Sequence, residues 1–151
     1  MKQLAMPATL FVEKNARSVA HKELPPIPNG LSDTAVSLLL FYVYCEPSWT
    51  KKEHKAARRM VLEIGQRCNI HGRGRCAPEG LNCTMTGSPV NVRLFCAELR
   101  EWKPEMFQSC DFKIDDSLET SQHFNALTIR KVDELVAYKL QGGDAPSLTK
   151  S

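Results

Sequence analysis

The feature that most constrains the fold is an apolar and aromatic run, SLLLFYVYC, at Ser37–Cys45. A bilayer-spanning helix takes about 20 apolar residues, so this run is far too short to cross a membrane and suits a single strand. Because nearly every position is apolar, we expect the strand to be buried on both faces and central in a sheet. The other elements are placed relative to this strand.

Two amphipathic helices are predicted after the strand, and each begins with a capping signal. Thr50 and the glutamate three residues later form a capping-box pattern, which predicts a helix from there to about Arg67. Ser88 followed by Pro89 is an N-cap with proline at the first helical position, which predicts a second helix to Trp102. Both helices carry an apolar stripe at helical spacing, so both should pack against the sheet.

The remaining strands form a hairpin and two later segments. The hairpin is predicted from Gly72–Ala77 and Leu81–Thr86, and further strands at Cys110–Ile114 and Leu127–Ile129. The order β-α-β-β-α-β predicts an α+β fold, the ferredoxin-like split βαβ sandwich, with an antiparallel sheet and two helices on one face. The open face of such a sheet is a common site for ligands and RNA. The hairpin connection, Pro78, Glu79 and Gly80, is typical of a type II turn.

Composition at the two ends of the chain predicts the domain limits. Residues 1–35 end in the breaker run LPPIPNG and are interpreted as a flexible leader and proline-rich linker, and residues 36–140 as the folded domain. Residues 141–151 are rich in Gly, Pro and Ser and predict a linker toward a further domain. With six cysteines, no signal-peptide core and no membrane-spanning run, we expect reduced thiols and a cytoplasmic protein, or one of an organelle stroma or matrix.

Basic residues gather in the first helix and the hairpin, whereas the region from Glu98 to Glu119 is acidic. This asymmetry suits an anionic partner, nucleic acid above all, although for one basic helix a solvated helix face is the preferred interpretation. The candidate phosphate contacts on the helix are Lys51, Lys52, Lys55, Arg58 and Arg59.

The hairpin predicts a second polar surface. Strand alternation should place Asn82 and Thr84 on one face, beside Arg73 and Arg75 if the two strands are in register. Such a strip suits phosphate or an RNA backbone, and it also suits a solvated sheet face. Both interpretations stay open from the residues alone.

Metal and thiol chemistry receive little support. Cys68, His71, Cys76 and Cys83 lie close in sequence, but only one pair has the tight spacing typical of zinc sites, so packed thiols are favoured and no metal or cofactor is expected. Cys76 follows an arginine, which could activate a thiolate. It has no assured base, and a structural role is the preferred interpretation.

The hairpin motif and its flanks resemble a known family. The motif is Gly72-Arg73-x-x-x-Ala77-Pro78-Glu79-Gly80-Leu81-Asn82-x-Thr84-x-x-Gly87, preceded by Phe41-Tyr42-Val43-Tyr44 and followed by Phe124-x-x-Leu127 and Val132-x-Glu134-Leu135-Val136. It is similar to the N-terminal acylphosphatase-like domain of a rhodanese-containing family that includes bacterial tRNA uridine 5-hydroxylases. The resemblance covers about Ser37 to Tyr138.

The resemblance implies a rhodanese domain after this one, with a C-x-x-G-x-R loop that no cysteine of this chain has. The arginine of acylphosphatase is also missing from its expected loop, residues 46–49. We therefore expect a non-catalytic accessory domain that helps to bind or position tRNA. The alternatives are a folding and interaction module that docks on the rhodanese domain, marked by an exposed apolar patch at Trp49 or Trp102, and a small enzyme that uses Cys76.

Overall fold

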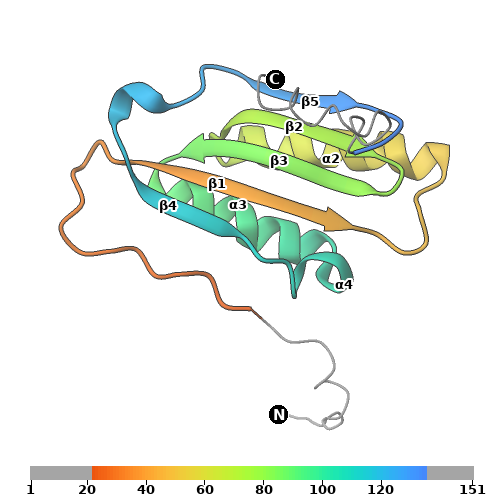
Figure 1. The fold of residues 1–151 in the computed structure, drawn as a ribbon, viewed down its shortest axis with the longest axis horizontal. Coiled ribbons are helices and arrows are strands. Elements are labelled where there is room, and N and C mark those ends of the chain that lie inside the picture. The colour runs from red at the N-terminus through yellow and green to blue at the C-terminus, as the bar shows by residue number, and fades with distance from the viewer. Residues whose placement is uncertain (1–21, 136–151) are drawn as a thin grey trace, which may run out of the picture.

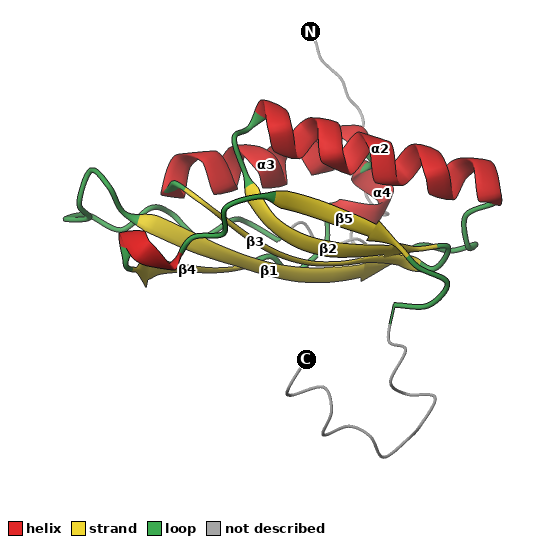
Figure 2. Cartoon of the chain, turned by 90° about the horizontal axis from the view of Figure 1, so that it is seen from above, coloured by secondary structure: helices red, strands yellow, loops and turns green. Residues whose placement is uncertain are grey.

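The computed structural model describes residues 22–135. The first part of the predicted leader and all of the predicted linker at 141–151 lie outside these residues. The described part forms a five-stranded sheet with helices packed on one face (Figures 1 and 2). Its elements are β1 (Val36–Tyr44), α2 (Lys51–Arg67), β2 (His71–Ala77), β3 (Gly80–Gly87), α3 (Pro89–Trp102), α4 (Pro104–Phe107), β4 (Lys113–Leu118), a 3-10 turn (Thr120–Gln122) and β5 (Leu127–Lys131).

The strand order β4-β1-β3-β2-β5 confirms the predicted α+β, ferredoxin-like architecture. The β1–β3, β1–β4 and β2–β3 pairs are antiparallel. The last strand, β5, pairs in parallel with β2, so the sheet is mixed rather than purely antiparallel. β5 is therefore the edge strand next to the β2–β3 hairpin.

Both predicted helix starts are confirmed. The Thr50 hydroxyl accepts a hydrogen bond from the Glu53 amide at 3.1 Å, and the Glu53 carboxylate accepts one from the Thr50 amide at 2.9 Å. Ser88 accepts from the Asn91 amide at 3.0 Å and begins α3. These caps satisfy amides that a helix leaves unpaired. In the folded domain α2 packs against β2 and β5, and α3 against β1 and β3.

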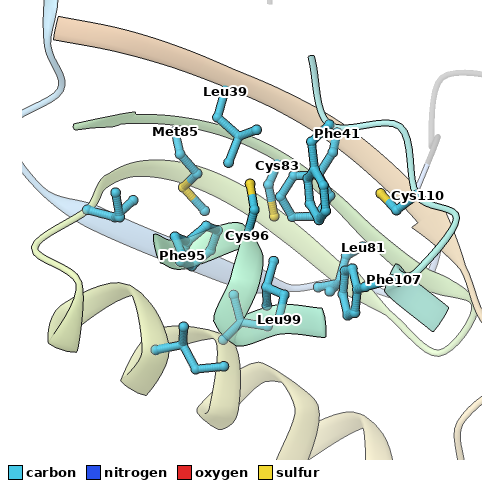
Figure 3. Packing of buried hydrophobic residues seen from close by; sticks show 14 of the residues in the cluster. Leu39, Phe41, Leu81, Cys83, Met85, Phe95, Cys96, Leu99, Phe107 and Cys110 are labelled. Atoms are coloured by element: carbon cyan, nitrogen blue, oxygen red, sulfur yellow. The ribbon is translucent and has the colours of Figure 1, made fainter. Parts of the chain in front are cut away.

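The core lies between the sheet and these two helices (Figure 3). The rings of Phe41 and Phe95 lie 6.5 Å apart, and those of Phe41 and Phe107 lie 6.1 Å apart in an edge-to-face arrangement. All six cysteines are free thiols and five of them are buried. No helix in the part of the chain that the structure describes is long and apolar enough to cross a membrane.

The prediction that β1 is buried on both faces is wrong. Leu39 and Phe41 are buried against the helices, whereas 65% of Tyr42 and 52% of Tyr44 is exposed, as is 39% of Leu40. The helices cover one face of the sheet, and among residues 22–135 no helix covers the other, which we call the open face (Figure 2). The strand does have neighbours on both sides, so its interior position was predicted correctly.

The fourth strand was predicted too early in the chain, at Cys110–Ile114. Cys110 and Phe112 are buried, but they precede β4 and fill the core from a loop. The strand itself has the sequence KIDDSL, whose charged residues conceal its β structure because it lies at the edge of the sheet. The apolar residues that led to the strand prediction belong to a loop, whereas the actual strand is defined by its backbone pairing with β1.

Part of the predicted leader lies along α3. The Arg93 guanidinium donates to the Pro25 carbonyl at 2.8 Å and to the Pro26 carbonyl at 3.3 Å. Two helical turns later, Arg100 donates to the Lys22 carbonyl at 2.5 Å. Two arginines on one helix therefore fix the path of the chain that enters the domain.

Candidate nucleic-acid interface

A row of polar and aromatic side chains crosses four strands on the open face. Tyr42 of β1 is paired with Asn82 of β3, and Asn82 is paired with Arg75 of β2. Arg75 is paired in turn with Arg130 of β5. Paired residues in neighbouring strands point to the same face, and the strands are about 4.8 Å apart. The row therefore leads from an aromatic ring to two guanidinium groups.

A second row lies next to the first and crosses all five strands. Lys113 is paired with Leu40, and Leu40 with Thr84. Thr84 is paired with Arg73, which is paired with Thr128. Strand alternation predicted that Asn82 and Thr84 would lie beside the two hairpin arginines. In the structure these four side chains do share one face of the sheet. The edge that carries β4 contributes a further cation.

The arginine ends of the two rows enclose a shallow hollow of about 270 Å³, here called the basic hollow. The Arg73 guanidinium lies over the Phe124 ring at 5.2 Å, and Arg75 donates to the Leu135 carbonyl at 3.4 Å. Among residues 22–135, neither they nor Arg130 pair with a carboxylate. Their charge is thus left for an outside anion. The hollow is lined by Arg73, Gly74, Arg75, Asn82, Thr84 and Arg130.

The other end of the rows forms a larger and more apolar hollow of about 410 Å³, here called the aromatic hollow. Tyr42 lines this hollow, and its ring meets the ring of Tyr44 edge to face, with centroids 6.1 Å apart. Asn82 and Thr84 line both hollows, so the two are continuous along the open face. The remaining lining comes from Leu40, Phe41, Cys83, Asp111 and Lys113.

The basic residues of α2 lie on the other side of the sheet from the hairpin arginines (Figure 2). Arg58 is partly buried, and its Nε donates to the Ile129 carbonyl at 2.6 Å, which ties α2 to β5. The other four candidates are exposed and stand apart from both hollows: Lys51, Lys52, Lys55 and Arg59. The predicted contacts therefore form two surfaces, one on each side of the sheet.

The hairpin connection is a structural junction. The Pro78 carbonyl accepts from the Trp49 amide at 2.7 Å, and the Glu79 carbonyl accepts from the Cys45 amide at 2.9 Å. The Glu79 carboxylate accepts from the Leu135 amide at 3.0 Å. The turn thus connects the loop after β1 with the segment after β5. Both of these regions adjoin or contain motifs that carry the family resemblance.

The type II assignment of this turn is wrong. A type II turn needs a positive φ at its third residue, Glu79, but the only described non-glycine residue with a positive φ is Asn69. The positive φ, +147°, belongs to Gly80 at the next position. There the β1 backbone approaches so closely that a β-carbon would lie 2.0 Å from the Val43 carbonyl oxygen.

The thiol chemistry considered from sequence finds no support in the geometry. Cys76 is fully buried, and burial raises the pKa of its thiol to about 11. Its carbonyl lies 2.5 Å from the His54 ring, so the neighbouring imidazole contacts the backbone. In residues 22–135 no three His, Cys, Asp or Glu side chains form a metal-binding group, and His71 lies on the opposite face of the sheet from Cys76.

Comparison with known proteins bears on the same part of the chain. The model of the family described as UPF0176 acylphosphatase like domain matches residues 36–135. The chain belongs to this family. A tRNA uridine(34) hydroxylase from Kocuria rhizophila is 28% identical over 113 residues, which are 75% of this chain. The chain spans about a third, 34%, of the length of that relative.

The fold of this acylphosphatase-like domain also occurs in a solved structure of distant sequence. The structure of a bacterial light-regulated adenylyl cyclase aligns with a TM-score of 0.53 at 10% identity, over 76% of this chain and 34% of the cyclase chain. At that identity the likeness concerns the fold alone. The resemblance seen in the hairpin motif is thus confirmed at the level of family and architecture.

Sequence reasoning about this domain missed Arg130, the third arginine of the basic hollow. The predicted strand ended at Ile129, two positions before the end of β5 and one position before Arg130. A strand pattern extended by that position would have placed Arg130 on the same face as Thr128, because residues two apart share a face. The parallel pairing that brings it beside Arg75 has no such signal in the sequence.

Proposed function

We propose that this domain binds tRNA on the open face of its sheet, as the accessory and non-catalytic part of a longer tRNA-modifying protein. The observation that carries the proposal is the basic hollow, where three guanidinium groups converge without a carboxylate partner among the described residues. Arginine binds phosphate through paired N–H donors. The name of the Kocuria relative supplies the class of RNA.

The geometry around the arginines suits a polyanion. Phe124 and the Leu135 carbonyl hold Arg73 and Arg75 from one side, so less side-chain entropy is lost when phosphate binds. Asn82 and Thr84 add neutral donors between the cations. Such contacts fix the position of a nucleic acid backbone without selecting its sequence.

The proposed role needs no chemistry from this domain and no cofactor. In the longer protein, a rhodanese domain would perform the modification while this domain holds the substrate. The work would take place where tRNA is modified, in the cytoplasm or in an organelle stroma or matrix. Lys51, Lys52, Lys55 and Arg59 of α2 would make secondary contacts at most, because they face away from the basic hollow.

Two charge-matched double variants test the proposal. In Arg73→Glu with Arg75→Glu, we expect tRNA affinity at low salt to fall at least about tenfold, and the slope of log affinity against log salt to decrease by about two. In Lys51→Glu with Lys52→Glu, which changes the net charge equally, we expect a loss of about twofold. Fluorescence anisotropy with labelled tRNA at several salt concentrations measures both.

The same titration shows how the proposal fails. Equal losses in the two double variants would mean that only net charge matters, and the open face would lose its special role. No tRNA binding by the unsubstituted protein at low salt would remove the proposed function altogether. Circular dichroism of each variant establishes that the fold is retained.

A second candidate, docking on a neighbouring protein domain, is favoured by α3. Val90 and Leu94, one helical turn apart, are 56% and 49% exposed and form an apolar spot on the outer side of the helix. Trp49 and Trp102, the markers expected from sequence, are instead partly buried against the core. This surface is separate from the open face, so both roles can coexist.

A further inference from the structure

The aromatic hollow is the feature that phosphate binding alone leaves unexplained. Tyr42 is 65% exposed although it lies in an interior strand, whereas tyrosine is on average a residue of intermediate burial. Its ring meets that of Tyr44 edge to face, so the two tyrosines hold each other in place. Rigid, exposed aromatic rings on an open sheet are suited to stacking with other flat groups.

The place of this hollow relative to the arginines limits what the flat group can be. Asn82 lies between Tyr42 and Arg75 in one row, so the Cα atoms that carry the ring and the guanidinium are two strand spacings, about 10 Å, apart. A ligand that fills both hollows must carry a flat apolar part and an anion within that distance. A nucleotide meets this requirement, because its base and its phosphate are joined through one sugar.

Base pairing decides which nucleotides can bind in this way. In a double-stranded RNA helix the bases are stacked on one another and their faces are closed to protein side chains. Nucleotides of loops and single strands can turn their bases out and stack them on aromatic rings. Asp111 and Lys113 at the far side of the aromatic hollow form an exposed ion pair at 2.8 Å, and their remaining oxygen and N–H groups can accept from and donate to the edge of such a base.

We propose that the open face is a binding platform for unpaired RNA nucleotides, with a base stacked on Tyr42 and its backbone phosphates in the basic hollow. The inference rests on the proposed function and adds the kind of RNA structure that the domain selects. For a tRNA, it assigns the contact to a loop or a single-stranded end rather than to a helical stem. Sequence preference is expected to be weak, because every base has a face that can stack.

The test uses the complete chain, a short single-stranded oligoribonucleotide and the same strand annealed to its complement. Tyr42→Thr removes the ring and keeps a β-branched residue in the strand. We expect single-strand affinity to fall about tenfold and duplex affinity to stay unchanged. Tyr42→Phe should restore single-strand binding, because it keeps the ring. Leu94→Ala, at an exposed apolar residue of α3, is the matched control and should change neither affinity.

Two results would overturn the inference, and they can be told apart. If Tyr42→Thr leaves single-strand binding unchanged while Arg73→Glu with Arg75→Glu abolishes it, the domain binds phosphate but not unpaired bases. An aromatic hollow that serves a protein partner would give this result. If the arginine variant has no effect either, the proposed function fails together with the inference.

Discussion

A Gly80→Ala variant is expected to lose about 3 kcal/mol or more of unfolding free energy. Gly80 has a φ of +147°, a conformation that costs a residue with a side chain about 1–3 kcal/mol. The added β-carbon would also lie 2.0 Å from the Val43 carbonyl oxygen and 2.8 Å from the Tyr44 α-carbon. Both are backbone atoms of β1, so they cannot move aside without disturbing the ladder between β1 and β3.

Gly30→Ala separates the two causes of this loss. Gly30 also has a positive φ, +86°, but a β-carbon there would meet nothing within 4 Å. We expect it to cost about 1 kcal/mol, from backbone strain alone. Urea denaturation followed by tryptophan fluorescence measures both variants. Equal losses in the two would show that the approach of β1 to the hairpin is looser than the structure has it.

The second large effect is expected from Asp116→Ala. Asp116 and Arg93 form a two-bond ion pair at 3.0 and 2.9 Å, with only 11% and 12% of their side chains exposed. Ser37 donates a further hydrogen bond to the same carboxylate. Removing the carboxylate leaves the largely buried Arg93 charge with backbone carbonyls as its partners and no counter-charge, and breaking a buried ion pair in this way typically costs about 3–5 kcal/mol. The exposed pair of Lys113 with Asp111 is the control, and Asp111→Ala should cost less than about 1 kcal/mol.

The same pair gives stability a defined dependence on pH. The Arg93 guanidinium holds the pKa of Asp116 below its ordinary value of 3.8. A carboxyl whose pKa is lower in the folded state stabilises the fold fully above its ordinary pKa. That contribution is lost as the pH falls from about 3.8 through the lower folded value. Between pH 5 and pH 3, Asp116→Ala should therefore lose less stability than the unsubstituted domain, which urea titrations at each pH would measure.

Helix caps and strand alternation let the sequence predict most of the fold, because both depend on residues close together in the chain. Thr50 and Ser88 marked helix starts that the structure confirms. The errors came from features that depend on distant residues. The apolar pattern of β1 cannot reveal that no helix of residues 22–135 covers one face of the sheet, so the exposure of Tyr42 was missed. The charged edge strand β4 was misplaced for a similar reason.

In the candidate site, too, the sequence predicted what depends on nearby residues and missed what depends on distant ones. Arg73, Arg75, Asn82 and Thr84 were placed together correctly because a hairpin fixes its own register. Arg130 was missed because its position depends on the parallel pairing of β5 with β2. The paired residues, Arg75 and Arg130, are more than 50 positions apart in the sequence. The helix cations could not be assigned to a side of the sheet from their charge alone.

An NMR titration of the labelled protein with tRNA would show which side of the sheet binds the RNA. The side-chain N–H signals to follow are those of Arg73, Arg130 and Asn82 on the open face, with Arg59 of α2 as the reference on the other side. If tRNA binds on the open face, the first three signals shift or broaden at the lowest tRNA concentrations while that of Arg59 stays in place. Shifts confined to Arg59 and its helix, with the open face unchanged, would contradict it.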